Sequence, residues 1–306
     1  MKYVVTGGAG FIGSHLTEQL VKKGDIVTVI DNLNTGKEKN LELVKEKIEF
    51  VKGSILDTKL LEEITKNVDG VFHQAALASV QDSFTKPEEY FKVNVEGTEN
   101  ILKLAEKKGF KVVYASSSSV YGNPKQIPIK ETDERNPFNP YAETKLKDEE
   151  LAINYSKKNV RVIGLRYFNV FGIGQSKEYA GVIKLFLERI RDGLPPRVNG
   201  DGKQFRDFVH VSDVVNANIM SMESNISHDF YNVGTNSSIT ILELAELIIK
   251  ISKLDIKPMF GPALKGDVDK TMANIELIKE KIGWTPSLFL EDWLQEIISL
   301  NKIDEV

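Results

Sequence analysis

Thr6-Gly7-Gly8-Ala9-Gly10-Phe11-Ile12-Gly13 is the stretch that decides the fold, because it leads from an apolar run into a helical pattern through closely spaced glycines. The run Tyr3-Val4-Val5 before it predicts a buried strand, and the pattern from Phe11 to Lys22 predicts a helix. The glycines have the spacing G-x-x-G-x-x-G. Their missing side chains allow a tight turn and a close approach of the backbone to a pyrophosphate, which free N–H groups at the start of a helix also favour. The stretch therefore predicts a dinucleotide-binding turn.

An acidic residue follows the second predicted strand, which runs from Ile26 to Ile30. Asp31 stands about twenty residues after the glycine turn, where a carboxylate can accept hydrogen bonds from both hydroxyls of an adenosine ribose and repels a 2′-phosphate. This favours NAD over NADP as the cofactor. A Walker-type phosphate loop is excluded, because no Gly-Lys-Ser or Gly-Lys-Thr follows the glycines.

Short apolar runs alternate with helical patterns through the first half of the chain. The further predicted strands are residues 48–51, 71–72, 112–114 and 160–165, and the predicted helices include residues 93–107 and the segment around Tyr141 and Lys145. Strands that alternate with helices and lack hairpin turns form parallel sheets covered on both faces. We therefore expect an α/β fold with a doubly wound parallel (Rossmann) sheet.

The pattern changes after Arg166, where longer loops rich in proline and glycine join the helices. These helices are predicted at residues 182–191, 241–251 and 290–300. We expect residues 1–166 to form an NAD-binding domain, to which residues 207–235 return. Residues 167–206 and 236–306 are expected to form a smaller α/β substrate-binding lobe.

The composition excludes several classes of protein. The 306 residues include no cysteine, so disulfides, thiolate nucleophiles and cysteine-ligated metals are ruled out. The net charge is −4 and no apolar stretch approaches membrane-spanning length, so neither nucleic acid nor a membrane is expected as a partner. The apolar start is too short for a signal-peptide core, which favours a cytoplasmic protein. The four histidines, His15, His73, His210 and His228, lack metal-ligand spacing, so we expect core or surface roles for them and no metal.

Tyr141 and Lys145 lie four residues apart, a spacing that places both side chains on one face of a helix. A free tyrosine has a pKa near 10, so a base at neutral pH needs roughly 4 kcal/mol of preference for the phenolate. An ammonium one turn away, beside the positive charge of an oxidised nicotinamide, can supply that preference in a shielded site. Ser117, at the end of the preceding strand, can donate a hydrogen bond to a substrate and relay the proton. The three residues predict a redox site in which Tyr141 moves a proton and a nicotinamide moves a hydride.

With these motifs together, the chain resembles the extended short-chain dehydrogenase/reductase family and, within it, the UDP-sugar 4-epimerases. The resemblance covers nearly the whole chain. It is carried by residues 6–15, Asp31-Asn32-Leu33, His73-Gln74-Ala75-Ala76, Asn94 with Gly97-Thr98, residues 116–122, residues 141–145, Arg166-Tyr167-Phe168-Asn169 and Arg206-Asp207-Phe208-Val209-His210.

The resemblance implies a role for each matching position. Tyr141 would be the base, Ser117 its hydrogen-bonding partner, and Lys145 a residue that binds the cofactor and tunes the pKa of Tyr141. The cofactor site would be lined by Gly7, Gly10, Phe11, Ile12, Gly13, Asp31, Asn32, Asn34, Thr35, Gly36, Ser54, Ile55, Gln74, Ala75, Ala76, Asn94, Tyr141, Lys145 and Tyr167. The substrate would be held by Ser79, Ser117, Ser118, Tyr141, Asn169, Gln204, Arg206, Asp267 and Thr271. The guanidinium of Arg206 suits a diphosphate, whose oxygens it can bind in a bidentate manner.

The residues after Ser117 distinguish reactions within the family. Related 4,6-dehydratases place Asp-Glu at the two matching positions, and sugar-nucleotide decarboxylases keep the Glu. This chain has Ser118 and Ser119, which cannot act as carboxylic acid–base groups. The reaction that remains is oxidation at C4 of the sugar, rotation of the 4-keto sugar, and return of the hydride to its opposite face.

Two further positions bear on the sugar. Glucuronate-specific epimerases carry an Arg where this chain has Gly181, so a neutral hexose is expected. Thr271 matches a position where a bulky Tyr narrows the sugar pocket in some members of the family, so an N-acetyl group is expected to fit. We therefore expect UDP-glucose and UDP-galactose, together with UDP-GlcNAc and UDP-GalNAc, as substrates.

Two positions depart from the family pattern. Ser54 replaces an adenine-facing Asp, and Leu264 replaces a second Arg for the diphosphate, which leaves Lys265 as the neighbouring cation. The alternatives left open are a UDP-glucuronate 4-epimerase, another sugar-nucleotide dehydrogenase or reductase, and a non-catalytic NAD-sensing protein. The resemblance also implies a homodimer formed through the helices at 93–107 and 142–155.

Overall fold

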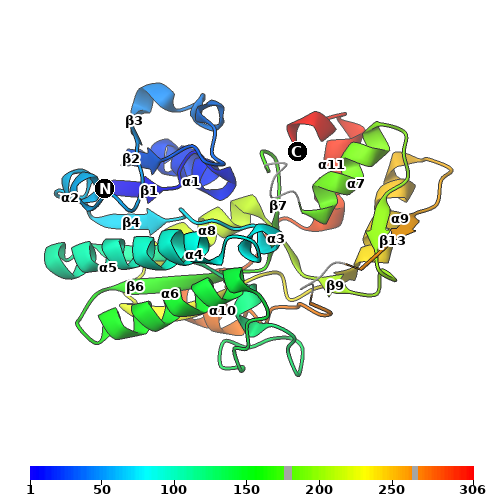
Figure 1. The fold of residues 1–306 in the computed structure, drawn as a ribbon. Helices are drawn as coiled ribbons and strands as arrows, with labels where there is room; N and C mark the ends of the chain where they lie inside the picture. Colours follow the sequence, from blue (N-terminus) through cyan, green and yellow to red (C-terminus); the bar gives the residue numbers. More distant parts are fainter. Residues whose placement is uncertain (176–180, 264–267) are drawn as a thin grey trace.

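The computed structural model describes residues 1–175, 181–263 and 268–306 (Figure 1). Within these residues, seven parallel strands form the main sheet in the order β11-β6-β5-β4-β1-β2-β3. Their bounds are β1 Lys2–Thr6, β2 Ile26–Asp31, β3 Ile48–Lys52, β4 Gly70–His73, β5 Lys111–Ser117, β6 Val162–Tyr167 and β11 His228–Val233. The strand order reverses between β1 and β4, and sheets of this kind bind ligands outside the carboxyl ends of their strands at that point.

Helices cover both faces of this sheet. α1 packs beside α8 on one face, and α5 packs beside α6 on the other. The helices of this part are α1 Phe11–Lys22, α2 Thr58–Ile64, α3 Val80–Ser83, α4 Pro87–Tyr90, α5 Gly97–Lys108, α6 Pro140–Ser156, α8 Val211–Glu223 and α10 Glu276–Ile282.

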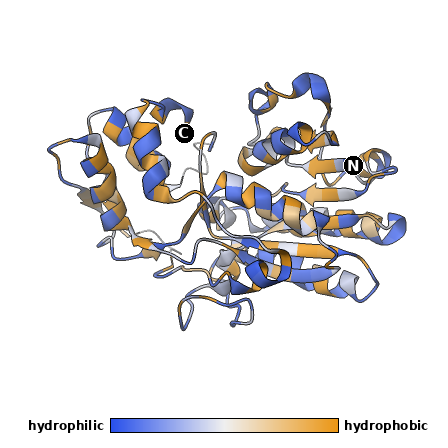
Figure 2. Ribbon diagram, turned by 180° about the vertical axis from the view of Figure 1, so that it is seen from behind, coloured by the Kyte–Doolittle hydropathy of each residue, from blue (hydrophilic) through white to orange (hydrophobic). Residues whose placement is uncertain are grey.

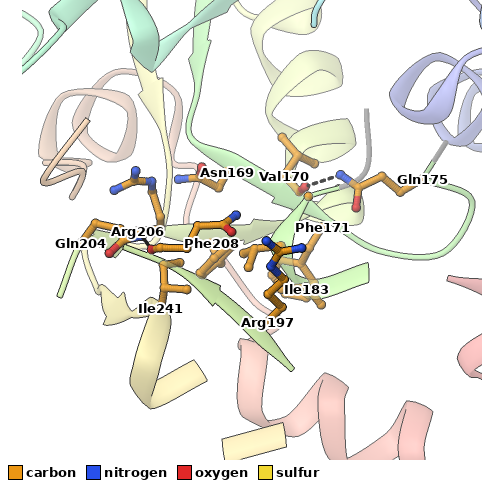
Figure 3. A pocket seen from close by; sticks show the side chains of 13 residues that line it. Asn169, Val170, Phe171, Gln175, Ile183, Arg197, Gln204, Arg206, Phe208 and Ile241 are labelled. Carbon is orange, nitrogen blue, oxygen red and sulfur yellow. Dashed lines mark hydrogen bonds between the residues drawn. The ribbon is translucent and has the colours of Figure 1, made fainter. Parts of the chain in front are cut away.

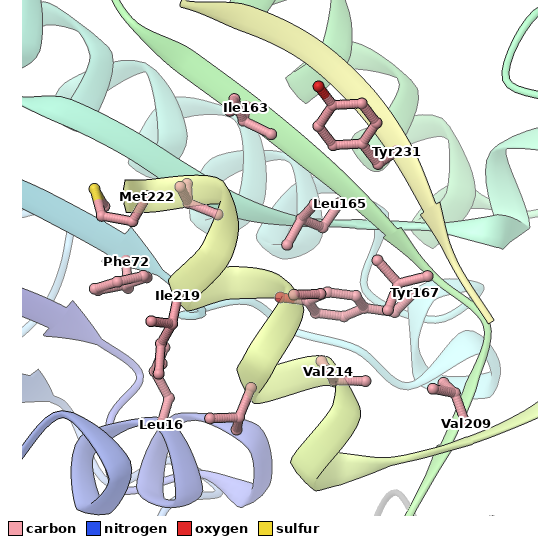
Figure 4. Packing of buried hydrophobic residues seen from close by; sticks show 14 of the residues in the cluster. Leu16, Phe72, Ile163, Leu165, Tyr167, Val209, Val214, Ile219, Met222 and Tyr231 are labelled. Atoms are coloured by element: carbon pink, nitrogen blue, oxygen red, sulfur yellow. The ribbon is translucent and has the colours of Figure 1, made fainter. Parts of the chain in front are cut away.

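The alternation of side chains along the strands divides the apolar residues between two cores. Tyr3 and Val5 on β1 join the cluster that contains Leu16 of α1, whereas Val4 joins the cluster that contains Leu102 of α5. Figure 4 shows the first cluster, in which side chains of α1, α8 and the central strands meet. Burial of both faces explains why these strands are short continuous apolar runs in the sequence.

The second part of the molecule has its own apolar core. Its helices are α7 Val182–Arg191, α9 Ile241–Ser252 and α11 Leu290–Ser299, and buried side chains such as Phe186, Leu244 and Trp293 join them. Figure 2 shows hydrophobic strands in the main sheet and mixed helices around it. The short strand pairs of the described residues are β7 Asn169–Phe171 with β10 Phe208–His210, β9 Phe205–Arg206 with β12 Ile239–Thr240, and β8 Arg197–Asn199 with β13 Met259–Gly261. None of the described helices is long and apolar enough to span a membrane.

The predicted α/β fold with a parallel Rossmann sheet is confirmed, with differences of detail. The strand predicted at 160–165 begins at Val162, and the helix predicted from residue 93 begins as a π-helix, Phe91–Glu96, that continues into α5. The segment 207–235 contributes β11 to the edge of the main sheet, beside β6. It also contains α8, a helix that the sequence pattern did not reveal.

Candidate active site

The glycine turn between β1 and α1 is closed tightly on itself and on the next strand of the sheet. Gly7 has φ +67°, a conformation that side chains other than glycine rarely adopt, and a Cβ there would lie 2.7 Å from the backbone nitrogen of Ala75. A Cβ on Gly13 would collide with the carbonyl oxygen of Gly7. The helix therefore begins against bare backbone, with its first N–H groups accessible from the crevice.

Asp31 ends β2 beside this turn, with 7% of its surface exposed. Its Oδ2 accepts a hydrogen bond from the Ala9 N–H at 3.0 Å, and its Oδ1 accepts one from the Leu33 N–H at 2.8 Å. Burial raises the pKa of Asp31, although these two hydrogen bonds oppose the rise. Each oxygen keeps a lone pair for a further donor, which two neighbouring ribose hydroxyls can supply.

A cleft of about 460 Å³ opens along the carboxyl ends of the strands. The predicted cofactor residues that line it are Gly7, Gly10, Phe11, Ile12, Gly13, Asp31, Asn32, Asn34, Thr35, Ser54, Ile55, Gln74, Ala75, Ala76, Tyr141, Lys145 and Tyr167. Gly36 and Asn94 lie behind the lining instead. A Cβ on Gly36 would lie 2.8 Å from the Oδ2 atom of Asp31, so this glycine backs the carboxylate. The Asn94 side chain is buried and exchanges hydrogen bonds with the backbone of Leu77, so it fixes the segment after β4.

Tyr141 stands in the first turn of α6. The Asn139 side chain caps the helix by accepting a hydrogen bond from the Ala142 N–H at 2.9 Å, and Pro140 occupies the first helical position. Lys145 lies one turn later, and both Tyr141 and Lys145 line the cleft. The predicted shared face of the helix is therefore present.

The ammonium of Lys145 is buried and has two partners. Its Nζ donates to the carbonyl oxygen of Ala115 at 3.0 Å and lies 3.3 Å from the Oδ2 atom of Asp148. Asp148 is on the same helix and has no exposed surface. Sequence reasoning had not identified Asp148 as a neighbour of this lysine.

The serine run ends β5 and presents its side chains in different directions. Ser117 lines the cleft, and its Oγ accepts hydrogen bonds from the Ser119 N–H at 3.1 Å and from the Ser119 hydroxyl at 2.9 Å. Because these bonds occupy the lone pairs of the oxygen, the Ser117 hydroxyl retains its own hydrogen to donate. Ser118 begins the short 3₁₀ helix Ser118–Tyr121 and is only partly exposed.

A buried ion pair lies directly behind the serine run. Glu149 of α6 accepts from Arg166 of β6 in a bidentate manner, with distances of 2.7 Å from Nε and 2.8 Å from Nη2. Ser116 donates to the same carboxylate at 2.8 Å, and Arg135 donates to it at 2.9 Å. Burial alone would raise the pKa of Glu149, but Arg166, Ser116 and Arg135 together hold the pKa of this carboxyl below its usual value. The carboxylate thus ties α6 to the ends of β5 and β6.

The opposite wall of the cleft is braced by a triangle of polar side chains. Gln74 donates to Asn218 at 3.0 Å, and Asn218 donates to the Tyr167 hydroxyl at 2.7 Å. That hydroxyl lies 3.1 Å from the side-chain oxygen of Gln74, and burial raises the pKa of Tyr167. Asn218 comes from α8, so the unpredicted helix supplies a support that sequence reasoning missed.

A second pocket of about 340 Å³ lies against the first (Figure 3). It is lined by Asn169, Val170, Phe171, Gln175, Gly181, Val182, Ile183, Arg197, Asn199, Gln204, Arg206, Phe208 and Ile241. Val170 and Gln175 line both pockets, so the two spaces adjoin. Arg206 is 7% exposed and donates to the Phe205 carbonyl oxygen at 2.9 Å. This pocket carries two guanidinium groups, those of Arg206 and Arg197.

The structure distributes the predicted substrate residues over several places. Ser117 and Tyr141 line the first pocket, and Asn169, Gln204 and Arg206 line the second. Thr271 is buried, and its hydroxyl oxygen accepts from Asn169 at 3.3 Å. Ser79 caps α3 by accepting from the Asp82 N–H at 3.1 Å. The predictions that concern Asp267, Leu264 and Lys265 fall outside the described residues.

Two residues of the second pocket were not predicted. Arg197 and Gln175 line this pocket but belong to none of the motifs quoted from the sequence. A search for the cation that replaces the Arg absent at position 264 could have singled out Arg197. No comparable signal pointed to Gln175.

The chain matches known proteins over most of its length. Residues 3–234 match the family model described as "NAD dependent epimerase/dehydratase family". Among solved structures, UDP-glucose 4-epimerase from Thermotoga maritima with UDP-glucose has a TM-score of 0.93 and 36% identity, and the match covers 99% of both chains. UDP-N-acetylglucosamine 4-epimerase from Methanobrevibacter ruminantium M1, in complex with UDP-N-acetylmuramic acid, also has a TM-score of 0.93 and 36% identity, over 99% of this chain and 98% of that chain.

One curated relative bears the name of a decarboxylase, in contrast to the two 4-epimerases. UDP-N-acetyl-alpha-D-glucosaminuronate decarboxylase from Bacillus cytotoxicus is 35% identical over 308 residues, and the match covers 96% of each sequence. These similarities confirm the predicted resemblance, and NAD is the cofactor by which the family is described. The chain belongs to the NAD dependent epimerase/dehydratase family.

Proposed function

We propose that this protein is an NAD-dependent 4-epimerase of UDP-hexoses, in which Tyr141 moves the proton of the C4 hydroxyl with the help of Lys145 and Ser117. The observation that carries the proposal is that these three side chains line one cleft, which adjoins a pocket containing Arg206. NAD supplies the acceptor and the donor of the hydride. All other steps fall to the side chains of this chain.

The residues that line the cleft suit NAD. The bare backbone at Gly7 and Gly13 leaves room for a pyrophosphate at the start of α1, and the helix dipole favours its charge. Asp31 holds two oxygens within the same cleft, which suits ribose hydroxyls and disfavours a 2′-phosphate. Ser54 lines the cleft where relatives place an adenine-facing carboxylate, so a hydroxyl would serve there.

Tyr141 would act from the first turn of its helix. Negative charge on its phenolate oxygen would be stabilised by the Lys145 ammonium, which lies one helical turn away along α6. The phenolate accepts the proton of the C4 hydroxyl while the hydride leaves C4, and it returns the proton to the same oxygen after the 4-keto sugar has rotated. Ser117 donates a hydrogen bond to that oxygen, because its own oxygen already accepts two hydrogen bonds from Ser119.

The end of β5 favours epimerisation over elimination or decarboxylation. Those reactions need a carboxylic acid–base group after the active-site serine, and this chain has Ser118 and Ser119 there. The carboxylate of Glu89 also lines the cleft, but it is exposed and comes from α4, 3.9 Å from the ammonium of Lys86. Because one relative bears the name of a decarboxylase, this serine pair is the sequence feature on which we base the choice of epimerisation.

The second pocket would hold the nucleotide diphosphate and orient the sugar. Arg206 and Arg197 offer guanidinium groups that match phosphate oxygens, and Arg197 would compensate for Leu264. Gly181 gives the pocket no cation for a sugar carboxylate. Thr271, which accepts a hydrogen bond from Asn169 of this pocket, is smaller than the Tyr of some relatives and would leave more space for an N-acetyl group. We therefore propose neutral hexoses, acetylated and non-acetylated, as the sugars.

The function is tested by product analysis after separate incubation with UDP-galactose, UDP-GalNAc and UDP-glucuronate. The first two are expected to give their C4 epimers without net NADH absorbance. If only UDP-glucuronate is turned over, the protein is a glucuronate epimerase. If NADH forms in an amount equal to the product, it is a one-way dehydrogenase. If it binds NAD but turns over none of the sugars, it is an NAD sensor. Any of these three results would overturn the proposal.

The role of Tyr141 has a matched control on the same helix. Tyr141→Phe removes only the phenolic oxygen and is expected to lower kcat by about 10²- to 10⁴-fold, the usual contribution of a general base. Tyr155→Phe makes the same change near the end of α6, where the hydroxyl lies 3.4 Å from Glu99, and it should leave kcat unchanged. Equal rates for the parent and Tyr141→Phe would refute the mechanism.

A further inference from the structure

The catalytic helix buries a carboxylate that the mechanism above does not use. Asp148 follows Lys145 by three positions on α6, and the Asp148 side chain has no exposed surface. Its Oδ2 lies 3.3 Å from the Lys145 Nζ, a long separation for an ion pair. Its Oδ1 is buried and accepts no hydrogen bond from any residue that the structure describes.

The Asp148 carboxylate accepts few hydrogen bonds for a group that is fully buried. A buried carboxylate usually accepts several hydrogen bonds, because taking its charge out of water costs several kcal/mol. Desolvation raises the pKa of Asp148 to about 6, even though Lys145 lowers it. A small neutral residue would fill the position at lower cost, so the charge of Asp148 calls for an explanation other than packing.

Among the residues that the structure describes, Lys145 is the cation that pairs with Asp148. Glu149, its neighbour on α6, is engaged by Arg166. His73 on β4 is buried, desolvation lowers its pKa to about 3, and it is therefore neutral.

Neither of the nearby hydroxyl groups supplies a countercharge. The Thr98 hydroxyl on α5 lies close enough to lower the pKa of Asp148, but it is neutral and donates its hydrogen to the Asn94 carbonyl oxygen at 2.6 Å. The hydroxyl of Tyr114 on β5 has no hydrogen-bond partner among the described residues.

We propose that Asp148 is a positioning residue: it holds the Lys145 ammonium at the base of the cleft and limits how much positive charge acts on Tyr141. The proposal rests on the proposed function, in which Tyr141 is the base. Lysine is a flexible cation, and the Ala115 carbonyl and Asp148 fix its ammonium from two sides. The same arrangement partly neutralises it, so the phenolate of Tyr141 is less stabilised than by an unpaired lysine.

The direct test is Asp148→Asn, which keeps the shape and removes the charge. The unit charge that is lost lies 3.3 Å from the ammonium, so the acidic limb of kcat/KM is expected to move to lower pH by about one unit. At alkaline pH, kcat should fall by less than about tenfold, because the ammonium loses one of its two fixed partners. The KM for the UDP-sugar should stay the same, because Asp148 does not line the second pocket.

Glu150→Gln is the matched control. It makes the same carboxylate-to-amide change on the same helix, but its side chain is 48% exposed and pairs with Lys147. Its pH profile should superimpose on that of the parent. If Asp148→Asn does not fold, Asp148→Ser, which is smaller, replaces it in the same comparison.

The outcomes separate this proposal from the proposed function. A folded Asp148 variant whose acidic limb coincides with the parent's, alongside an inactive Tyr141→Phe, overturns the positioning role and leaves the function intact. An active Tyr141→Phe overturns the function itself. A shifted limb in the Asp148 variant, with Glu150→Gln unchanged, supports the positioning role, because a purely structural residue would change stability without moving the pH profile.

Discussion

Replacing Glu149 by glutamine should be among the most destabilising conservative changes in this chain. Each oxygen of Glu149 accepts two hydrogen bonds: Oε1 from Arg166 Nε and Ser116 Oγ, and Oε2 from Arg166 Nη2 and Arg135 Nη1. A glutamine must place its amide nitrogen at one of these positions. In either orientation one N–H group of the Arg166 guanidinium then faces another donor instead of an acceptor.

The magnitude follows from the burial of the pair. The side chains of Arg166 and Glu149 are 2% and 0% exposed, so water cannot replace the lost partner. Removing one member of such a pair leaves an uncompensated charge and costs about 3–5 kcal/mol. This is a large share of the roughly 5–15 kcal/mol by which folded domains are stable. Removing the Arg166 charge as well should recover part of this loss. The double variant Glu149→Gln with Arg166→Met should therefore lose less free energy of unfolding than the sum of the two single variants.

Urea unfolding followed by tryptophan fluorescence measures the effect. The chain has two tryptophans, and each reports on one apolar core: Trp284 is buried in the core of the main sheet, and Trp293 is buried in the core that joins α7, α9 and α11. Glu150→Gln, an exposed change on the same helix, should stay within about 0.5 kcal/mol of the parent. A loss below about 1 kcal/mol for Glu149→Gln would refute the reasoning, because it would show that the buried charge has another partner.

Two further predictions concern the pH dependence of stability and the glycine turn. Burial raises the pKa of Asp207 to about 6, against roughly 3.9 in an unfolded chain, so the folded state keeps a proton that the unfolded state loses. The stability that Asp207 contributes therefore falls as the pH rises from about 4 to about 6. The urea midpoint of the parent should exceed that of Asp207→Asn by less and less across this range. A difference that grows with pH would contradict a raised pKa for Asp207. Gly13→Ala should abolish NAD binding in calorimetry and lower Tm, because its Cβ collides with the Gly7 carbonyl oxygen. Gly10→Ala, whose Cβ would lie 3.2 Å from the same oxygen, should be much milder, and equal effects of the two changes would show that this contact does not hold the turn.

The sheet and the dinucleotide turn could be predicted from the sequence because their signals are local. The glycine spacing, Asp31 and the apolar runs of the strands are each determined by the residues beside them. Helix α8 could not be predicted in the same way. It buries polar residues such as Asp213, whose carboxylate accepts hydrogen bonds from Ser287 and Leu288 far along the chain. Buried polar residues interrupt the helical repeat of apolar residues, so the pattern cannot be recognised before their partners are known.

The same limit applies to the site. Tyr141, Lys145 and Ser117 could be found because their spacing and order carry the chemistry. Asp148 and Glu149, by contrast, belong to the run Lys145-Leu146-Lys147-Asp148-Glu149-Glu150, which resembles an ordinary solvated helix surface. Only the packing of α6 against β5 and β6 shows that the carboxylates of Asp148 and Glu149 are buried while that of Glu150 remains exposed.

The helix α6 therefore links the stability of the fold to the chemistry of the site. Glu149 binds Ser116, which precedes Ser117 in the chain, and the same helix carries Tyr141 in its first turn. A Glu149→Gln variant that remains folded should consequently lose kcat, because the base and the serine would no longer be held at a fixed separation. Its KM for the UDP-sugar should change little, since Glu149, Ser116 and Arg166 are not among the described residues that line the second pocket. A variant in which KM rises and kcat is unchanged would show that the buried ion pair supports the substrate lobe and not the alignment of Tyr141 with Ser117.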